Sequence, residues 1–210
     1  MLHTLSLHVR RHVKEQQSLY WFTFVLLMMG VFFGAVLVNS LPLGIKNDLH
    51  RYVQQFLTQF EKGSFVTSAQ IFKQSLSHHA GYIGLMWVLG LSVAGVPFIL
   101  ILLFLKGVVS GFTIGFLVQQ MGSKGFFLAV ASILPQNIVV IPCYMIMSAV
   151  SIGISLSIIK HLFKQNRSSY IPAVLTRSLM AACFVLVMLA SASLFEGYIS
   201  PIFIRLVIGE

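Results

Sequence analysis

The chain has 210 residues, of which 14 are Lys or Arg and 5 are Asp or Glu. Charged residues make up 9% of the sequence, against about 25% in a typical soluble domain, and 57% of the residues are hydrophobic. This composition cannot cover a soluble globule with a charged surface, and it also excludes a coiled coil or a disordered tail. The sequence therefore predicts an integral membrane protein.

Five long stretches of the chain contain no Asp, Glu, Lys or Arg. A helix needs roughly 20 apolar residues to cross a bilayer, whereas the strands of a barrel would alternate polar and apolar residues. These stretches are continuously apolar, so we expect an all-α integral membrane protein with five transmembrane helices. The expected spans are residues 18–38, 81–105, 107–121, 126–159 and 178–198.

A short basic lead, residues 1–17, precedes the first expected span. A cleaved signal peptide is the alternative interpretation, but the following apolar run is longer than the usual hydrophobic region of such a peptide. We therefore expect a retained span. Gly30 and Gly34 form a GxxxG pair on it, which is typical of a face that packs against another helix.

Residues 39–80 form the longest polar segment, and we expect it outside the cytoplasm. Its apolar residues, including Phe56 and Phe60, recur at helical spacing up to Gly63, and Phe72 belongs to a second such pattern. Two amphipathic helices are therefore expected. They could lie on the membrane surface, cover the bundle or receive a partner protein, with packing on the chain's own spans or on lipid as the more common outcome.

Lys106 and Gly107 mark either a tight turn between the second and third spans or a polar point in a longer bent segment. Gly107, Gly111 and Gly115 are spaced four apart, so they share one helix face that a neighbouring helix can approach closely. The glycine faces of the first and third spans are also compatible with a homodimer.

The fourth expected span, 126–159, is too long for one perpendicular helix. Pro135 and Pro142 bracket Gln136 and Asn137, and each proline removes a backbone donor. We expect either one kinked span or a re-entrant element up to Pro142 followed by a span. The two polar side chains either satisfy the freed backbone groups, which is the preferred interpretation, or line a small site.

The basic segment 160–177 is expected in the cytoplasm, together with the N-terminus. An odd number of spans then places the tail, residues 199–210, outside the cytoplasm. Glu196 is expected on that outer side, and all seven histidines are expected outside the spans.

Few residues with catalytic chemistry remain inside the expected spans. There is no embedded Ser–His pair, no second aspartate beside Asp48, no HExxH sequence and no phosphate-binding loop, so we expect no enzyme, no metal and no cofactor. Cys143 and Cys183 are expected to be small residues in apolar stretches rather than a disulfide or metal pair. The basic residues are scattered, which argues against nucleic acid as a partner. A small permease or channel with a polar constriction at Gln136 and Asn137 remains as an alternative function.

The stretch from Phe72 to Pro142 resembles the stage II sporulation protein M family. The resemblance rests on an amphipathic lead, a span, the glycine-spaced run from Gly107 to Gly115 and the proline-bracketed run from Ile133 to Pro142. Chain length, five expected spans and the basic lead extend it to nearly the whole chain.

The resemblance implies a fold and a role. Members of this family are membrane components of the complex that holds extracytoplasmic peptidoglycan-degrading enzymes at the sporulation septum during engulfment. It therefore implies a multi-pass scaffold in the bacterial cell membrane, on the mother-cell side of the septum, with membrane-tethered peptidoglycan hydrolases as partners. Phe56, Phe60 and Phe72 are candidate partner-binding residues, and a groove between spans is an alternative docking surface.

One motif departs from the family pattern. Relatives read approximately Pro-His-Gly-x-x-Glu where this chain has Pro135, Gln136, Asn137 and Val140. The ionisable pair is absent here, so a proton- or metal-dependent role of relatives does not extend to this chain.

Overall fold

The computed structural model describes residues 17–61, 68–164 and 170–199. These residues are almost entirely helical, and no strand occurs among them. The elements are α2 (Gln17–Leu37), η1 (Val38–Ser40), α3 (Leu43–Glu61), α4 (Ser68–Gly90), α5 (Gly95–Ser132), α6 (Leu134–Lys164), α7 (Tyr170–Leu194) and η2 (Phe195–Ile199).

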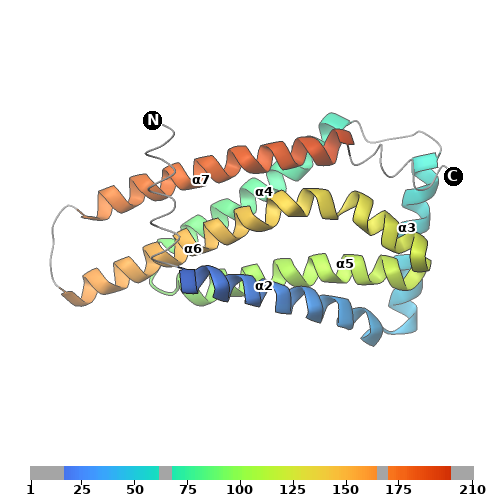
Figure 1. The fold of residues 1–210 in the computed structure, drawn as a ribbon, viewed down its shortest axis with the longest axis horizontal. Helices are drawn as coiled ribbons and strands as arrows, with labels where there is room; N and C mark the ends of the chain where they lie inside the picture. Colours follow the sequence, from blue (N-terminus) through green and yellow to red (C-terminus); the bar gives the residue numbers. More distant parts are fainter. Residues whose placement is uncertain (1–16, 62–67, 165–169, 200–210) are drawn as a thin grey trace.

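The long helices α2, α4, α5, α6 and α7 run along one axis as a bundle, and α3 lies across one end of it (Figure 1). Four helices in the described part of the chain are long and apolar enough to cross a membrane: Gln17–Ser40, Gly95–Val130, Leu134–Ile159 and Ser178–Ile199. The chain is therefore an all-α protein with four candidate membrane-spanning helices. The fifth long helix, α4, is more polar.

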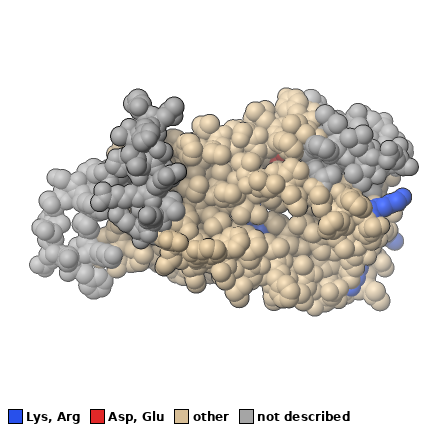
Figure 2. All heavy atoms as spheres, in the orientation of Figure 1, with Lys and Arg blue, Asp and Glu red and all other residues tan. Residues whose placement is uncertain are grey.

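The surface of the bundle is typical of a protein in lipid. Large apolar side chains such as Phe32 on α2 and Val187 on α7 are exposed, and the visible flank carries almost no charge (Figure 2). The basic side chains in that view gather mainly at the end where α3 lies. Apolar side chains that face outward are stable only in an apolar solvent, so the bilayer is the natural environment of these helices.

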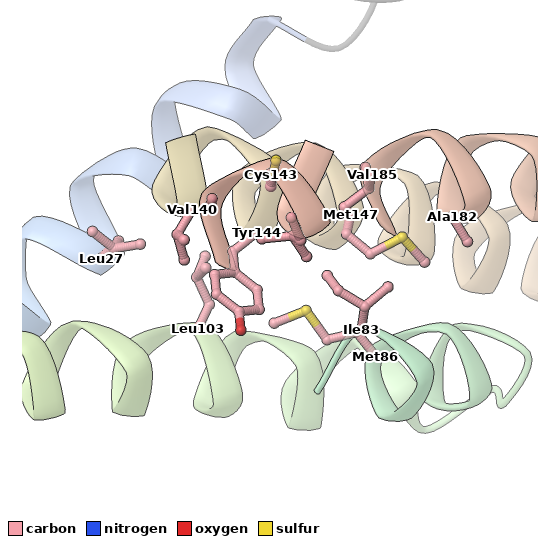
Figure 3. Packing of buried hydrophobic residues seen from close by; sticks show 12 residues of the cluster. Leu27, Ile83, Met86, Leu103, Val140, Cys143, Tyr144, Met147, Ala182 and Val185 are labelled. Carbon is pink, nitrogen blue, oxygen red and sulfur yellow. The ribbon is translucent and has the colours of Figure 1, made fainter. Parts of the chain in front are cut away.

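A compact apolar core joins the helices at the middle of the bundle. Leu27, Met86, Leu103 and Leu189, contributed by α2, α4, α5 and α7, are all buried, and Tyr144 of α6 lies at their centre (Figure 3). Because spanning helices gain little from the hydrophobic effect inside lipid, close packing of this kind holds them together.

The expected span over 81–105 was wrong, because the chain turns between Gly90 and Gly95. The amides of Leu91 and Ser92 close this turn on the carbonyls of Val88 and Leu89, and the Gly95 amide donates to the Ser92 carbonyl. The sequence offered Pro97 as a kink, but it lies in the first turn of α5, where a missing amide donor costs nothing.

Because the turn lies between Gly90 and Gly95, Lys106 is inside a helix rather than at the end of one. Helix α5 passes through Lys106 and Gly107 without interruption, so the tight turn expected there is wrong and the polar point in a longer segment is confirmed. Lys106 lies inside a candidate membrane span.

A second reversal lies at Gly122, inside the segment assigned to α5. Gly122 has φ 58° and ψ −131°, a conformation that only glycine adopts at low cost. Gly125 is packed against the backbone of Leu117, eight residues earlier, which a straight helix would place more than a turn away. The chain therefore folds back here, next to the Ser123–Lys124 loop expected from the sequence.

The helix that follows Gly122 is kinked at Ile133. The Ile133 amide donates to the Ala129 carbonyl at 2.9 Å, and the Asn137 amide donates to the Ile133 carbonyl at 3.2 Å. Hydrogen bonding thus continues across the junction of α5 and α6, and Pro142 lies within α6. The structure therefore has the kinked form of this element.

Three further bounds differ from expectation. The second amphipathic helix is not separate, because α4 begins at Ser68 and continues to Gly90. The expected loop 160–177 is shorter, since α6 extends to Lys164 and α7 begins at Tyr170. Most of the N-terminal lead and all but the first residue of the tail lie outside the described residues.

Candidate functional site

Helix α4 carries a polar stripe on the face that points into the bundle. Ser75, His79 and Tyr82 follow the i, i+4, i+7 spacing of one helix face. Ser75 and His79 are buried, and Tyr82 is half-buried. A soluble amphipathic helix buries its apolar face, but a helix inside lipid exposes apolar side chains and turns polar ones inward.

His79 and Tyr144 form the centre of the site. The His79 Nδ1 lies 2.8 Å from the Tyr144 hydroxyl, and the two side chains are 6% and 0% exposed. Tyr82 packs edge-on against the Tyr144 ring at 5.1 Å between centroids, and its hydroxyl donates to the backbone carbonyl of Leu102 on α5. These contacts give the His79 Nδ1 and the hydroxyls of Tyr82 and Tyr144 partners within the chain.

Lys106 lies beside this pair. Its Nζ is 5.2 Å from the centroid of the Tyr144 ring, a distance at which the ring face attracts a cation. Lys106 is partly accessible rather than fully buried. An ammonium group inside a membrane span is costly and usually marks a functional position.

The end of α7 supplies the acidic group of the site. The Ser75 hydroxyl donates to the Glu196 carboxylate at 2.5 Å, and the Ser193 hydroxyl lies 3.1 Å from Ser75. Glu196 is on η2, a π-helical turn, and Gly197 beside it is buried against Ser68 and Phe72 of α4. The Glu196 carboxylate also acts electrostatically on Lys106. The cluster therefore connects α4, α5, α6 and the α7–η2 segment. It contains one basic side chain, Lys106, and one acidic side chain, Glu196.

The sequence did not predict this cluster. His79 was expected outside the spans, but it is buried in the bundle. Glu196 lies near the end of the candidate span Ser178–Ile199, and its bond to Ser75 on α4 was not expected. In the sequence, charged residues were used to mark the ends of the spans. This rule fails when a charged side chain lies inside a span and contacts a partner on another helix. The i, i+4, i+7 stripe of α4 was the available signal.

The five glycines singled out from the sequence meet in one contact between α2 and α5. A Cβ added at Gly30 would lie 3.2 Å from the Cα of Gly107, and one added at Gly34 would lie 2.8 Å from the amide nitrogen of Phe112. Gly111 and Gly115 face the backbone of Val31 and Ala35. Both glycine faces are thus covered within the chain, which removes the packing argument for a homodimer.

The proline-bracketed residues lie apart from the cluster, near the start of α6. Pro135, Gln136 and Asn137 are half-buried, and Pro142 is exposed. The Gln136 Oε1 is buried and has no hydrogen-bond partner in the described part of the chain.

The three candidate partner-binding residues have different positions. Phe56 and Phe60 lie on α3, but their side chains are outside the described residues. Phe72 is half-buried against Gly197 of the chain itself. On α3, Leu43 and Tyr52 are 78% and 71% exposed.

The described side chains of the cluster are hydrogen-bonding and charged groups. In the residues that the structure covers, no group of three His, Cys, Asp or Glu side chains could hold a metal ion. What the arrangement provides chemically is a cation and an anion held inside an apolar bundle.

The comparisons with known proteins identify the family. The model of the family described as stage II sporulation protein M matches residues 23–201. No curated protein and no solved structure matches the chain. The match extends from the first described span to the end of η2 and includes every residue of the cluster. The chain belongs to the stage II sporulation protein M family.

Proposed function

We propose that this sporulation-related membrane protein is a non-catalytic scaffold that holds extracytoplasmic peptidoglycan-degrading enzymes at the septal membrane during engulfment. The observation that carries the proposal is the position of α3. This helix crosses one end of the bundle and presents Ile45 and Tyr52, which share one helix face, to the surroundings. A face of this kind is suited to a partner protein that sits at the membrane surface.

The proposed topology has five crossings. Helix α4 is the fifth crossing, beside the four apolar helices, because it packs along α5, α6 and α7 with its polar stripe inward. The chain then crosses outward on α2, inward on α4, outward on α5 to Gly122, inward on the kinked helix and outward on α7. With the N-terminus in the cytoplasm, α3 and the turn at Gly122 lie outside it.

The proposed docking surface is the apolar face of α3, with Ile45 and Tyr52, seven residues apart and 47% and 71% exposed, at its accessible positions and Phe56 and Phe60 further along the same helix. Phe72 is a poorer candidate than the sequence indicated, since it packs on Gly197. A channel with its constriction at Gln136 and Asn137 is not favoured by the family, and the polar cluster lies elsewhere.

The test is capture of the hydrolases by the full chain. The chain is tagged, expressed in sporulating cells and purified in mild detergent, and the peptidoglycan-degrading enzymes recovered with it are quantified. The double variant Ile45→Ser and Tyr52→Ser is expected to lower their recovery at least tenfold. The matched control is Gln55→Ser, an exposed polar position on the same helix. Undiminished recovery with the double variant would overturn the α3 surface, and turnover of peptidoglycan by the isolated chain would overturn the non-catalytic role.

A further inference from the structure

The basic and acidic side chains of the polar cluster are not paired directly. Lys106 is partly accessible inside a candidate span, and no salt bridge to it is formed among the residues that the structure describes. Its ammonium lies over the face of the Tyr144 ring, 5.2 Å from the ring centroid. Glu196 acts on it only at longer range, because that carboxylate is bonded to the Ser75 hydroxyl at 2.5 Å.

The depth of Lys106 restricts what can reach it. At 1.5 Å per residue, it lies about 17 Å from the start of α5 and about 24 Å from the turn at Gly122. A bilayer core is about 30 Å thick, so the ammonium lies near its middle, well below the phosphates of the lipid headgroups. Figure 2 shows a few Lys or Arg atoms set back among apolar side chains midway along the visible flank.

In the part of the chain that the structure describes, a second copy offers no free carboxylate at this depth. Asp48 and Glu61 lie on α3 at the end of the bundle, and Glu196 is already bonded to Ser75. This favours the membrane-spanning helix of another protein as the source of a carboxylate at the depth of Lys106.

We propose that Lys106 is the receptor for one Asp or Glu in the middle of a partner protein's membrane anchor, which packs against the bundle where Lys106 lies over Tyr144. Charge complementarity inside an apolar solvent supplies the selectivity, since an unpaired carboxylate and an unpaired ammonium are both costly there. This inference rests on the proposed function, because it describes how a membrane-tethered partner is recognised within the bilayer.

The proposal also predicts that substitutions at Glu196 and at Lys106 change the binding of the partner carboxylate in opposite directions. Its negative charge near Lys106 opposes the entry of another carboxylate, so removal of that charge should strengthen binding, whereas removal of the Lys106 charge should weaken it. A purely structural Lys106–Glu196 pair would instead make the two neutralising substitutions act in the same direction.

The test uses three leucine-rich single-span peptides that differ only in a central Glu, Gln or Lys. Each is reconstituted with the full chain in liposomes of neutral lipid at mildly alkaline pH, and association is measured by energy transfer between labels. The Glu peptide is expected to bind at least tenfold more tightly than the Gln peptide. Lys106→Met should abolish this preference, and Glu196→Gln should increase it. The matched control, Lys124→Met, alters an exposed lysine beyond Gly122 and should leave the preference unchanged.

Several outcomes would overturn the inference: equal binding of the Glu and Gln peptides, a preference that survives Lys106→Met, or a loss of preference when anionic lipid is added, which would identify a headgroup as the occupant. Self-association that depends on Lys106 would identify a second copy instead. Helix content and thermal unfolding are checked for each variant, and if Lys106→Met fails to fold, the sign of the Glu196→Gln effect decides. Hydrolase capture through α3 is measured separately, so a negative peptide result with intact capture rejects only this inference.

Discussion

The contact between α2 and α5 predicts a large effect of one added methyl group. In Gly111→Ala, the new Cβ would lie 2.7 Å from the Cα of Val31 and closer still to its carbonyl group. Carbon atoms in contact are normally about 3.5–4.0 Å apart, so the helices must separate by about 1 Å. The obstacle is backbone, which cannot rotate away. Overpacking of this kind costs about 1–3 kcal/mol, which corresponds to a decrease in Tm of about 2–12 °C.

The assay is thermal unfolding of the purified chain in detergent, followed by circular dichroism. The matched control is Gly84→Ala on α4, where an added Cβ has no neighbour within 4 Å and the substitution should be neutral or stabilising by up to about 1 kcal/mol. If Gly111→Ala unfolds at the temperature of the unmodified chain or above it, the close contact of α2 with α5 is refuted.

Three other substitutions follow from single contacts and use the same unfolding assay. Tyr144→Phe removes the hydroxyl that bonds His79 and should destabilise the chain by about 1–3 kcal/mol; an unchanged Tm would show that this hydrogen bond is absent. Gly122→Ala places a side chain at φ 58° and should cost about 1–3 kcal/mol, so a stabilising effect would contradict the reversal at this residue. Ser155→Ala removes the bond from its hydroxyl to the Ser92 carbonyl and should cost about 0.5–1.5 kcal/mol, and no loss would place the turn after α4 elsewhere.

The apolar part of the fold could be predicted from the sequence, because the bilayer requires long uncharged helices. The first span, the GxxxG pair and the end of the third span near Gly122 follow from this rule. The sequence could also indicate that Gly107 and Gly111 face a neighbouring helix, but not which one. That assignment depends on the order in which the helices pack, which no local pattern encodes.

The polar part could not be predicted in the same way. A lysine in an apolar stretch looks like the end of a span, and its contact with Tyr144, from the next long helix, can be seen only in the folded chain. His79 was likewise expected outside the spans. Composition reports how polar a segment is, whereas the partners of a polar side chain are decided by tertiary packing.

The central claim is that the chain presents α3 outside the cytoplasm, where the hydrolases act. The direct measurement is labelling of single cysteines by a membrane-impermeant thiol reagent, after Cys143 and Cys183 have been replaced. Asp48→Cys on α3 and Lys124→Cys after Gly122 should react in intact protoplasts, and Val93→Cys in the turn after α4 should react only after permeabilisation. The opposite pattern, with α3 protected and Val93→Cys labelled, would contradict the proposed scaffold.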